Sequence, residues 1–315
     1  MDMTVCIATM FNDGGIIGVS DRMISTADSS FEPEGMTKKI FAVAPNINAM
    51  NAGDTSIQSE IMEAMQARYN AAKPQTPDVR FTVKLMVDSY LDCYNQAKKK
   101  RINDSILARW NLDLDSFLAR QNGFSEIFIR EIMGQIEQFH LPETETIITG
   151  IDTSTGQIEP HIYTIRKSAY YESIDCCDSI GYAAVGVGAR HVDSQFMLAK
   201  FSRHFPLPKV LFLAYLAKRR SEVALGVGKQ TDFFLIGPTL VVNTSLAKII
   251  DYKKLEKLYD KIITAEKEQT EAAFNEIQDY FKDKLPNSPT QPNEFPGEGA
   301  QEAFDKRFPD ENDKK

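Results

Sequence analysis

Residues 4–21 read TVCIATMFNDGGIIGVSD, and this stretch decides the fold. Two β-branched, apolar runs, residues 4–11 and 16–20, flank the sequence Asn-Asp-Gly-Gly at 12–15. Because those four residues form turns and tolerate positive φ, the pattern predicts a tight β-hairpin. Thr4 then opens the first strand.

A second hairpin is predicted after a polar loop. The loop covers residues 22–36, and the two strands are 39–44 (KIFAVA) and 47–52 (INAMNA), joined at Pro45 and Asn46. Four strands therefore precede the first helix.

The first helix is expected to begin after Gly53, because Thr55 and Gln58 match a capping box and apolar residues follow at helical spacing. Similar signals predict the remaining elements. Helices are expected at about 55–72, 79–102, within 103–139 with a break near Asn122-Gly123, 189–203, 209–220 and 251–284, and strands at 144–151, 158–166, 182–187, 231–236 and 239–243.

The order of these elements, with groups of strands alternating with pairs of helices, indicates an α+β fold in which two packed sheets have helices outside. We expect a four-layer αββα sandwich over residues 1–250, with a helical insertion at about 103–139. A charged amphipathic helix with a thin apolar stripe follows at 251–284. The acidic, proline-rich remainder, 285–315, is predicted to be disordered.

Composition narrows the class of protein. The chain has 315 residues, of which 43% are hydrophobic, so it can supply a full core. A formal net charge of −8 disfavours a nucleic-acid-binding face, since such faces are basic. Neither a signal-peptide pattern nor an apolar run of about 20 residues is present, so we expect no membrane partner.

Cysteine and histidine spacing gives no sign of a metal site or a cofactor. Cys6, Cys93, Cys176 and Cys177 form neither a disulfide framework nor a metal-binding pattern, and the histidines are scattered. We therefore expect no cofactor and no metal, and a cytoplasmic location.

Four residues of the opening stretch suit one kind of catalysis. The hydroxyl of Thr4 becomes a nucleophile if a base takes its proton, and a threonine's own α-amine, with a pKa of about 7.7–8.0, is one such base. Lys39 would steady the developing alkoxide and Asp21 would hold that lysine charged. Backbone N–H groups after Gly53 would receive an oxyanion at the helix start.

Each of these residues also has an ordinary explanation when taken singly. Thr4 is a good strand residue, Lys39 suits a solvated strand end, Asp21 suits a turn and Gly53 suits the approach to a helix. The combination of all four residues favours a catalytic site.

The segments MTVCIATMFNDGGIIGVSDRM, TKKIFAV and AMNAGDTSIQSEI resemble the opening of the proteasome β-type subunits. These are N-terminal-nucleophile (Ntn) threonine peptidases that include the bacterial HslV subunit and the Anbu proteins, and the Met-Thr-x-Cys start is most similar to Anbu. The resemblance is clearest over residues 4–72 and weaker over about 144–243. It implies the Ntn-hydrolase sandwich and hydrolysis of peptides or unfolded proteins through an acyl-enzyme.

The resemblance also assigns roles to residues. It implies that Thr4 is the nucleophile, that Asp21 and Lys39 are its charged partners, with Lys38 as the alternative lysine, and that Gly53 forms the oxyanion hole.

Departures from the family pattern lie in the second half of the chain. Val187 stands where active relatives have a serine, and Glu222 and Leu225 stand where they have an aspartate and a serine. In this alignment Glu222 is the candidate to substitute for the acid.

Catalysis of this type requires Thr4 to become the N-terminal residue. Asp2 disfavours simple methionine removal after Met1, so three routes are open: initiation at Met3, self-cleavage between Met3 and Thr4, or a blocked and inactive Thr4. With three residues before Thr4, the sequence also favours the β type over the α type, which has a helix before the first strand.

The resemblance implies self-association into a ring or a helical assembly, and it leaves any ATPase partner unknown. Two alternatives to a threonine endopeptidase stay open at this point. One is a catalytically silent assembly or binding protein with the same fold, and the other is an Ntn amidase that acts on a small non-peptide amide.

Overall fold

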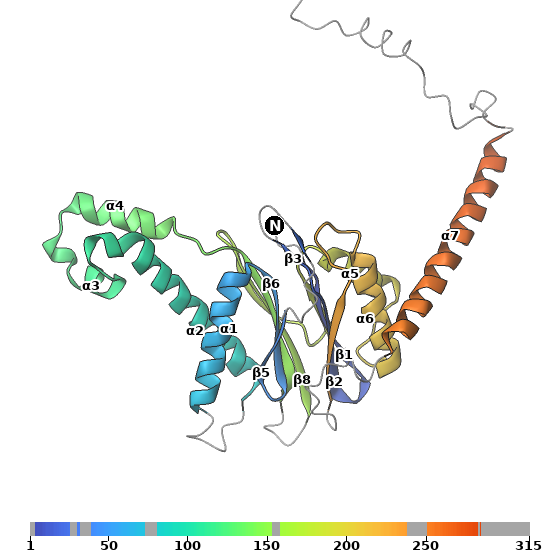
Figure 1. The fold of residues 1–315 in the computed structure, drawn as a ribbon, viewed down its shortest axis with the longest axis horizontal. Coiled ribbons are helices and arrows are strands. Elements are labelled where there is room, and N and C mark those ends of the chain that lie inside the picture. Colours follow the sequence, from blue (N-terminus) through green and yellow to red (C-terminus); the bar gives the residue numbers. More distant parts are fainter. Residues whose placement is uncertain are drawn as a thin grey trace, which may run out of the picture. The chain divides into compact units, whose positions relative to one another are not determined.

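The computed structural model describes residues 4–25, 30–31, 39–72, 81–152, 158–237, 251–282 and 284. The chain divides into two compact units, Met1–Leu255 and Glu256–Lys315. The first unit is a mixed α+β fold with two antiparallel sheets and holds all the candidate site residues (Figure 1).

The first sheet has the strand order β10-β1-β2-β11. Its strands are β1 (Cys6–Phe11), β2 (Gly15–Asp21), β10 (Tyr182–Val185) and β11 (Thr231–Ile236). The predicted first hairpin is confirmed, because β1 and β2 pair from Cys6 with Ser20 to Phe11 with Gly15. The turn between them, Asn12–Gly14, has φ of 68° at Asp13 and 73° at Gly14, as the Asp-Gly sequence favours.

The second sheet has the order β5-β6-β7-β8-β9. Its strands are β5 (Ile40–Ala44), β6 (Ile47–Gly53), β7 (Thr144–Asp152), β8 (Glu159–Lys167) and β9 (Glu172–Cys176). Strand β9 was missed by the sequence prediction because it is a mostly exposed edge strand without an apolar face. A small ribbon of β3 (Ile24–Ser25) and β4 (Ser30–Phe31) lies in the region predicted as a loop.

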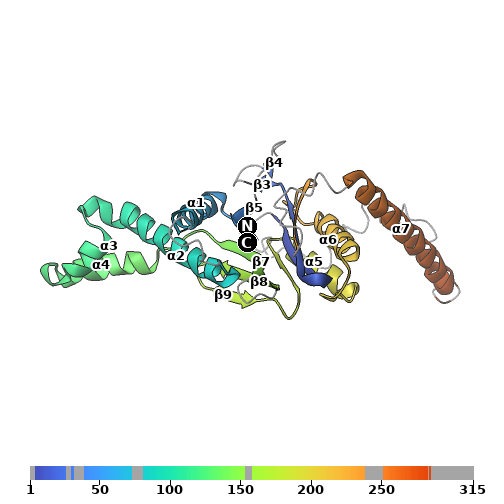
Figure 2. The ribbon, with the colours of Figure 1, turned by 90° about the horizontal axis from the view of Figure 1, so that it is seen from below.

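One apolar cluster joins the two sheets, and it includes Met10 from β1, Ile147 from β7 and Phe234 from β11. Helices α1 (Thr55–Ala72) and α2 (Val83–Ile102) pack on the second sheet through a separate cluster. Helices α5 (Ala189–Leu198) and α6 (Leu207–Ser221) pack against each other, and α6 contacts β1 and β2 of the first sheet. Figures 1 and 2 show the two helix pairs on opposite sides of the sheets.

The stretch 103–139 is helical, as predicted, and has a core of its own, whereas its status as an insertion stays a prediction. A π-helical turn, Asn103–Leu107, continues α2 and is followed by a 3-10 turn, Ala108–Trp110, then by α3 (Leu114–Ala119) and α4 (Glu126–Glu137). The 3-10 turn Gln121–Gly123 is the predicted break. Ile106, Phe117 and Ile132 are buried together, so this segment folds on itself.

The start of α1 differs from the prediction in its capping residue. The side chain of Asp54 accepts a hydrogen bond of 2.9 Å from the backbone N–H of Ile57, so Asp54 is the N-cap. The side chain of Gln58 donates to the carbonyl of Ala52 at 2.5 Å instead of completing a box with Thr55. The capping-box prediction was therefore wrong by one residue.

Helix α7 (Tyr252–Lys282) matches the predicted charged helix. Leu255 is its buried residue, whereas Phe274 and Ile277 are more than half exposed. Within the described ranges, no helix combines the length and the apolar composition needed to cross a membrane. The predicted strand at 239–243 and the segment 285–315 lie outside the described residues.

Candidate functional site

Thr4 lies two residues before β1 and is 3% exposed. Its carbonyl accepts a hydrogen bond of 3.2 Å from the backbone N–H of Gly188. Gly186 passes so close that an added Cβ would lie 2.4 Å from the Thr4 carbonyl oxygen, and its φ is +89°. The backbone of Thr4 is therefore held by the turn that follows β10.

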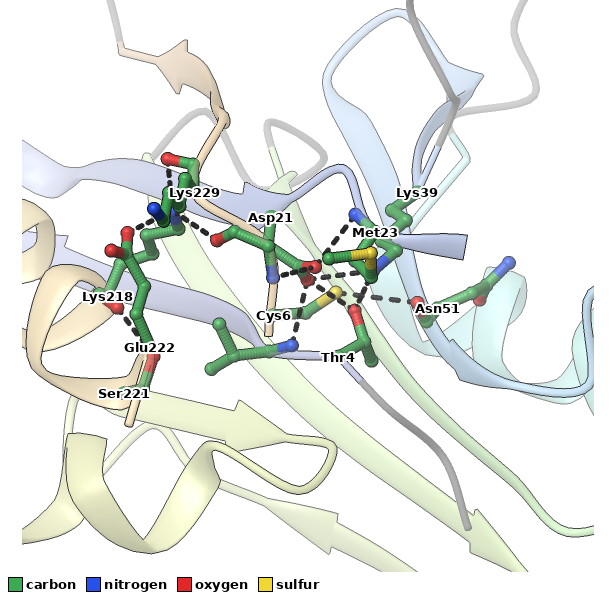
Figure 3. A network of polar contacts seen from close by, with 12 residues as sticks. Thr4, Cys6, Asp21, Met23, Lys39, Asn51, Lys218, Ser221, Glu222 and Lys229 are labelled. Carbon is green, nitrogen blue, oxygen red and sulfur yellow. Dashed lines mark hydrogen bonds and ion pairs between the residues drawn. The ribbon is translucent and has the colours of Figure 1, made fainter. Parts of the chain in front are cut away.

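The carboxylate of Asp21 is the centre of the site and is fully buried (Figure 3). Its Oδ1 accepts from the Thr4 hydroxyl at 2.5 Å and from the Val5 backbone N–H at 2.9 Å. Its Oδ2 accepts from the backbone N–H groups of Met23 at 2.9 Å and Gly228 at 3.0 Å. These donors fix the direction of both oxygens.

Lys39 enters the site from the second sheet, just before β5. Its Nζ donates to the Thr4 hydroxyl oxygen and, at 2.8 Å, to Oδ1 of Asp21. Its carbonyl accepts from the backbone N–H of Asn51 at 3.0 Å, which ties it to β6. Lys39 is thus the lysine that contacts Thr4, whereas Lys38 lies outside the described residues.

The register of the strands explains why the three residues meet. Cys6 pairs with Ser20, so Val5 lies opposite Asp21 and Thr4 follows at the same end of the hairpin. The strand with Lys39 comes from the other sheet, and the two sheets pack face to face. The site therefore forms where one end of each sheet meets the other.

Cys6 lies beside Thr4, Asp21 and Lys39, and its thiol stays protonated. Its Sγ lies 3.4 Å from the carbonyl oxygen of Asn51. Burial raises the pKa of the Cys6 thiol to about 12, although the charge of Lys39 opposes that shift. A thiol with that pKa supplies almost no thiolate near neutral pH, so Cys6 is a poor nucleophile.

Gly53 ends β6, and its φ of +119° lies in a region that favours glycine. It follows Asn51 by two residues on the strand that holds Lys39. Among the described hydrogen bonds none joins Gly53 to Thr4, so the oxyanion-hole role of Gly53 stays a prediction.

Glu222 follows the end of α6, and its carboxylate is engaged elsewhere. Its Oε1 lies 2.7 Å from Nζ of Lys218 and 3.5 Å from Nε of Arg219. Figure 3 shows this pair on the far side of Asp21 from Thr4. Glu222 is therefore not brought to the Thr4 hydroxyl in the described geometry. Val187 and Leu225, at the other departures, are 40% and 87% exposed.

Sequence reasoning missed Lys218 and Gly228, which connect Glu222 to Asp21. Lys218 is fully buried although it begins the charged run Lys-Arg-Arg, which resembles an ordinary solvated helix end. One signal was present: Lys218 lies four residues after the buried Ala214, on the apolar face of α6. The link between Gly228 and Asp21 spans 207 residues and had no local signal.

Comparisons with protein-family models and with curated proteins gave no match for this chain. In the described part of the chain, no group of three or more His, Cys, Asp or Glu side chains has the geometry to hold a metal ion.

Proposed function

We propose that this protein is a threonine-type amide hydrolase of the Ntn class, in which Thr4 attacks peptide bonds after residues 1–3 are removed. We further propose that the first unit is the four-layer αββα sandwich of the proteasome β-type, HslV and Anbu subunits. The two packed sheets and the flanking helix pairs support that assignment.

One observation carries the proposal: Lys39 and Asp21 converge on the hydroxyl of Thr4. The hydroxyl donates to Asp21 and accepts from Lys39, and these two charged groups are themselves paired at 2.8 Å. A buried charge is costly unless it is paired and hydrogen-bonded, and the Asp21 carboxylate accepts from three further donors, the backbone N–H groups of Val5, Met23 and Gly228. Here the lysine compensates it and places a positive charge beside the threonine oxygen.

The proposed reaction follows from this geometry. As the Thr4 Oγ1 attacks the substrate carbonyl carbon, its proton passes to the free α-amine of Thr4, and the Lys39 ammonium stabilises the developing negative oxygen. The carbon–nitrogen bond then breaks, and the amine gives the proton to the leaving nitrogen. Water attacks the resulting ester, the amine takes one of its protons, and Thr4 Oγ1 recovers a proton as the acid product leaves.

Two preparations test the proposal. One begins at the natural gene start, and its intact mass shows whether residues 1–3 are absent. The other releases a chain that begins at Thr4 from a cleavable fusion. We expect the Thr4 chain to hydrolyse peptides and to form a covalent adduct with a threonine-directed electrophile, and we expect Thr4→Ala to do neither while it keeps the fold. Equal turnover by Thr4→Ala would overturn the proposal.

The same assay separates the other functions. Turnover of small amides with no cleavage in a peptide library would identify an amidase. An intact Met-Asp-Met terminus, together with an unreactive Thr4 chain, would identify a silent assembly protein. We also propose a cytoplasmic homo-oligomer, either a ring or a helical assembly, and light scattering that finds only a monomer would contradict that part.

A further inference from the structure

Lys218 is a buried cation that the proposed reaction does not use. It lies in the last turn of α6 and is 0% exposed. Burial lowers the pKa of Lys218, and the nearby Glu222 and Asp21 carboxylates oppose this, while Arg219 adds to it. An apolar side chain would avoid the desolvation cost at this position. The buried ammonium therefore needs partners that compensate its charge.

Three acceptors surround the ammonium of Lys218. They are Oε1 of Glu222 at 2.7 Å, the carbonyl of Gly228 at 2.8 Å and the carbonyl of Lys229 at 2.8 Å. These match the three donors of an ammonium group. Lys218 therefore fixes two successive peptide units of the loop that leads into β11.

The same loop residue holds the catalytic carboxylate. The N–H of Gly228 donates to Oδ2 of Asp21 at 3.0 Å, while its carbonyl accepts from Lys218 (Figure 3). The described donors to Oδ2 are the two backbone N–H groups of Met23 and Gly228. With Oδ2 held in this way, Oδ1 is turned toward Thr4 and Lys39.

We propose that Lys218 is a positioning residue that acts through Gly228 to orient the carboxylate of Asp21 toward Thr4. This inference rests on the proposed function, because it assigns Lys218 a part in the same reaction. It also gives Glu222 a role different from the one expected from the sequence: Glu222 is the counter-ion of Lys218 and not a partner of Thr4.

A double-mutant cycle tests the inference in the Thr4 chain. We expect Lys218→Met to lower kcat by about 10-fold to 100-fold with little change in KM, because it misplaces a group without removing substrate contacts. In an Asp21→Asn background the same substitution should cause almost no further loss. Lys209→Met, an exposed lysine change on the same helix, is the control and should retain wild-type kcat.

A second variant controls for misfolding, and a second measurement does not depend on catalytic activity. Lys218→Met/Glu222→Gln removes the charge that Lys218→Met leaves unpaired, and it should show the same loss of kcat. In the intact Lys218→Met chain, backbone amide hydrogen exchange should be about 10-fold faster than in wild type in peptides covering Met23 and Gly228. Exchange in α1 should be unchanged.

These measurements separate the two proposals. The role of Lys218 would be overturned if the kcat losses of Lys218→Met and Asp21→Asn were additive. It would also be overturned if Lys218→Met left the hydrogen exchange of Gly228 unchanged. If the wild-type Thr4 chain has no turnover, the proposed function fails. The exchange result then decides alone whether Lys218 holds the Asp21 carboxylate in place.

Discussion

The hydroxyl of Thr4 donates a hydrogen bond of 2.5 Å to Oδ1 of Asp21, across the open end of the hairpin that they share. Both residues are buried, and Lys39 from the other sheet contacts the same two oxygens. In the proposed reaction the base is the α-amine of Thr4, which becomes free only when residues 1–3 are removed.

Asp21→Asn is expected to reduce both stability and activity. It leaves the buried ammonium of Lys39 without its counter-charge, so we expect a loss of about 3 kcal/mol in the free energy of unfolding and at least about 100-fold in kcat. Urea unfolding and peptide hydrolysis measure the two effects. Asp232→Asn, at a more exposed pair with Arg22, is the matched control and should cost about 1 kcal/mol or less. Equal losses of stability in the two variants would contradict the prediction.

Gly186→Ala is expected to displace Thr4. The new Cβ would meet the Thr4 carbonyl oxygen at 2.4 Å, and φ of +89° is strained for alanine, so we expect a destabilisation of about 2 kcal/mol or more and lower hydrolysis. Gly134→Ala is the control. Nothing lies within 4 Å of its added Cβ, and alanine favours the helix by about 0.5–1 kcal/mol. A tolerated Gly186→Ala would show that the turn does not hold Thr4.

Cys6→Ala is expected to retain activity within about threefold, since a thiol with a pKa of about 12 is not the nucleophile. The comparison with Thr4→Ala therefore distinguishes the two candidate nucleophiles beside Lys39. In the folded protein, alkylation followed by mass spectrometry should modify the exposed Cys176 first and leave the buried Cys6 unmodified. Loss of turnover in Cys6→Ala with an unchanged fold would contradict this assignment.

His161 is expected to stabilise the fold at acidic pH. The hydrogen bond to Asp178, 2.7 Å long, raises the pKa of His161, burial opposes this, and Asp152 and Glu159 add to it. A raised pKa in the folded state gives stability that is fully present below the unfolded pKa of about 6.5 and is lost as the pH rises through the folded pKa. The stability difference between wild type and His161→Gln should therefore be larger at pH 5.5 than at pH 8.5.

Urea unfolding at both pH values measures that difference. Burial raises the pKa of Asp178, but the hydrogen bonds from His161 and from the Ile162 backbone N–H, with the other groups around it, together outweigh burial and lower that pKa. Both pH values therefore stay above the acid range in which Asp178 loses its charge. A stability difference that grows with pH would have the wrong sign. His191→Gln is the control, as its side chain lies on the exposed side of α5.

The sequence by itself determined the parts of the fold and the site that depend on local signals. The Asn-Asp-Gly-Gly turn fixed the register of the first hairpin, and that register places Thr4 beside Asp21. The helical stretch 103–139 and its break near Gly123 were also predictable, because apolar spacing and turn residues act over a few positions. Strand β9 was not, since an exposed edge strand carries no apolar pattern.

Only the tertiary structure decided which charged residues serve the site. Glu222 looked like a substitute acid, yet it pairs with Lys218, and Lys218 looked like a solvated helix end, yet it is fully buried. The position of Lys218 depends on how α6 packs against β2 and on the loop at Gly228, which lies 207 residues from Asp21 in the chain. Hydrogen bonds between such distant segments form only after the core has assembled, so no local sequence pattern encodes them.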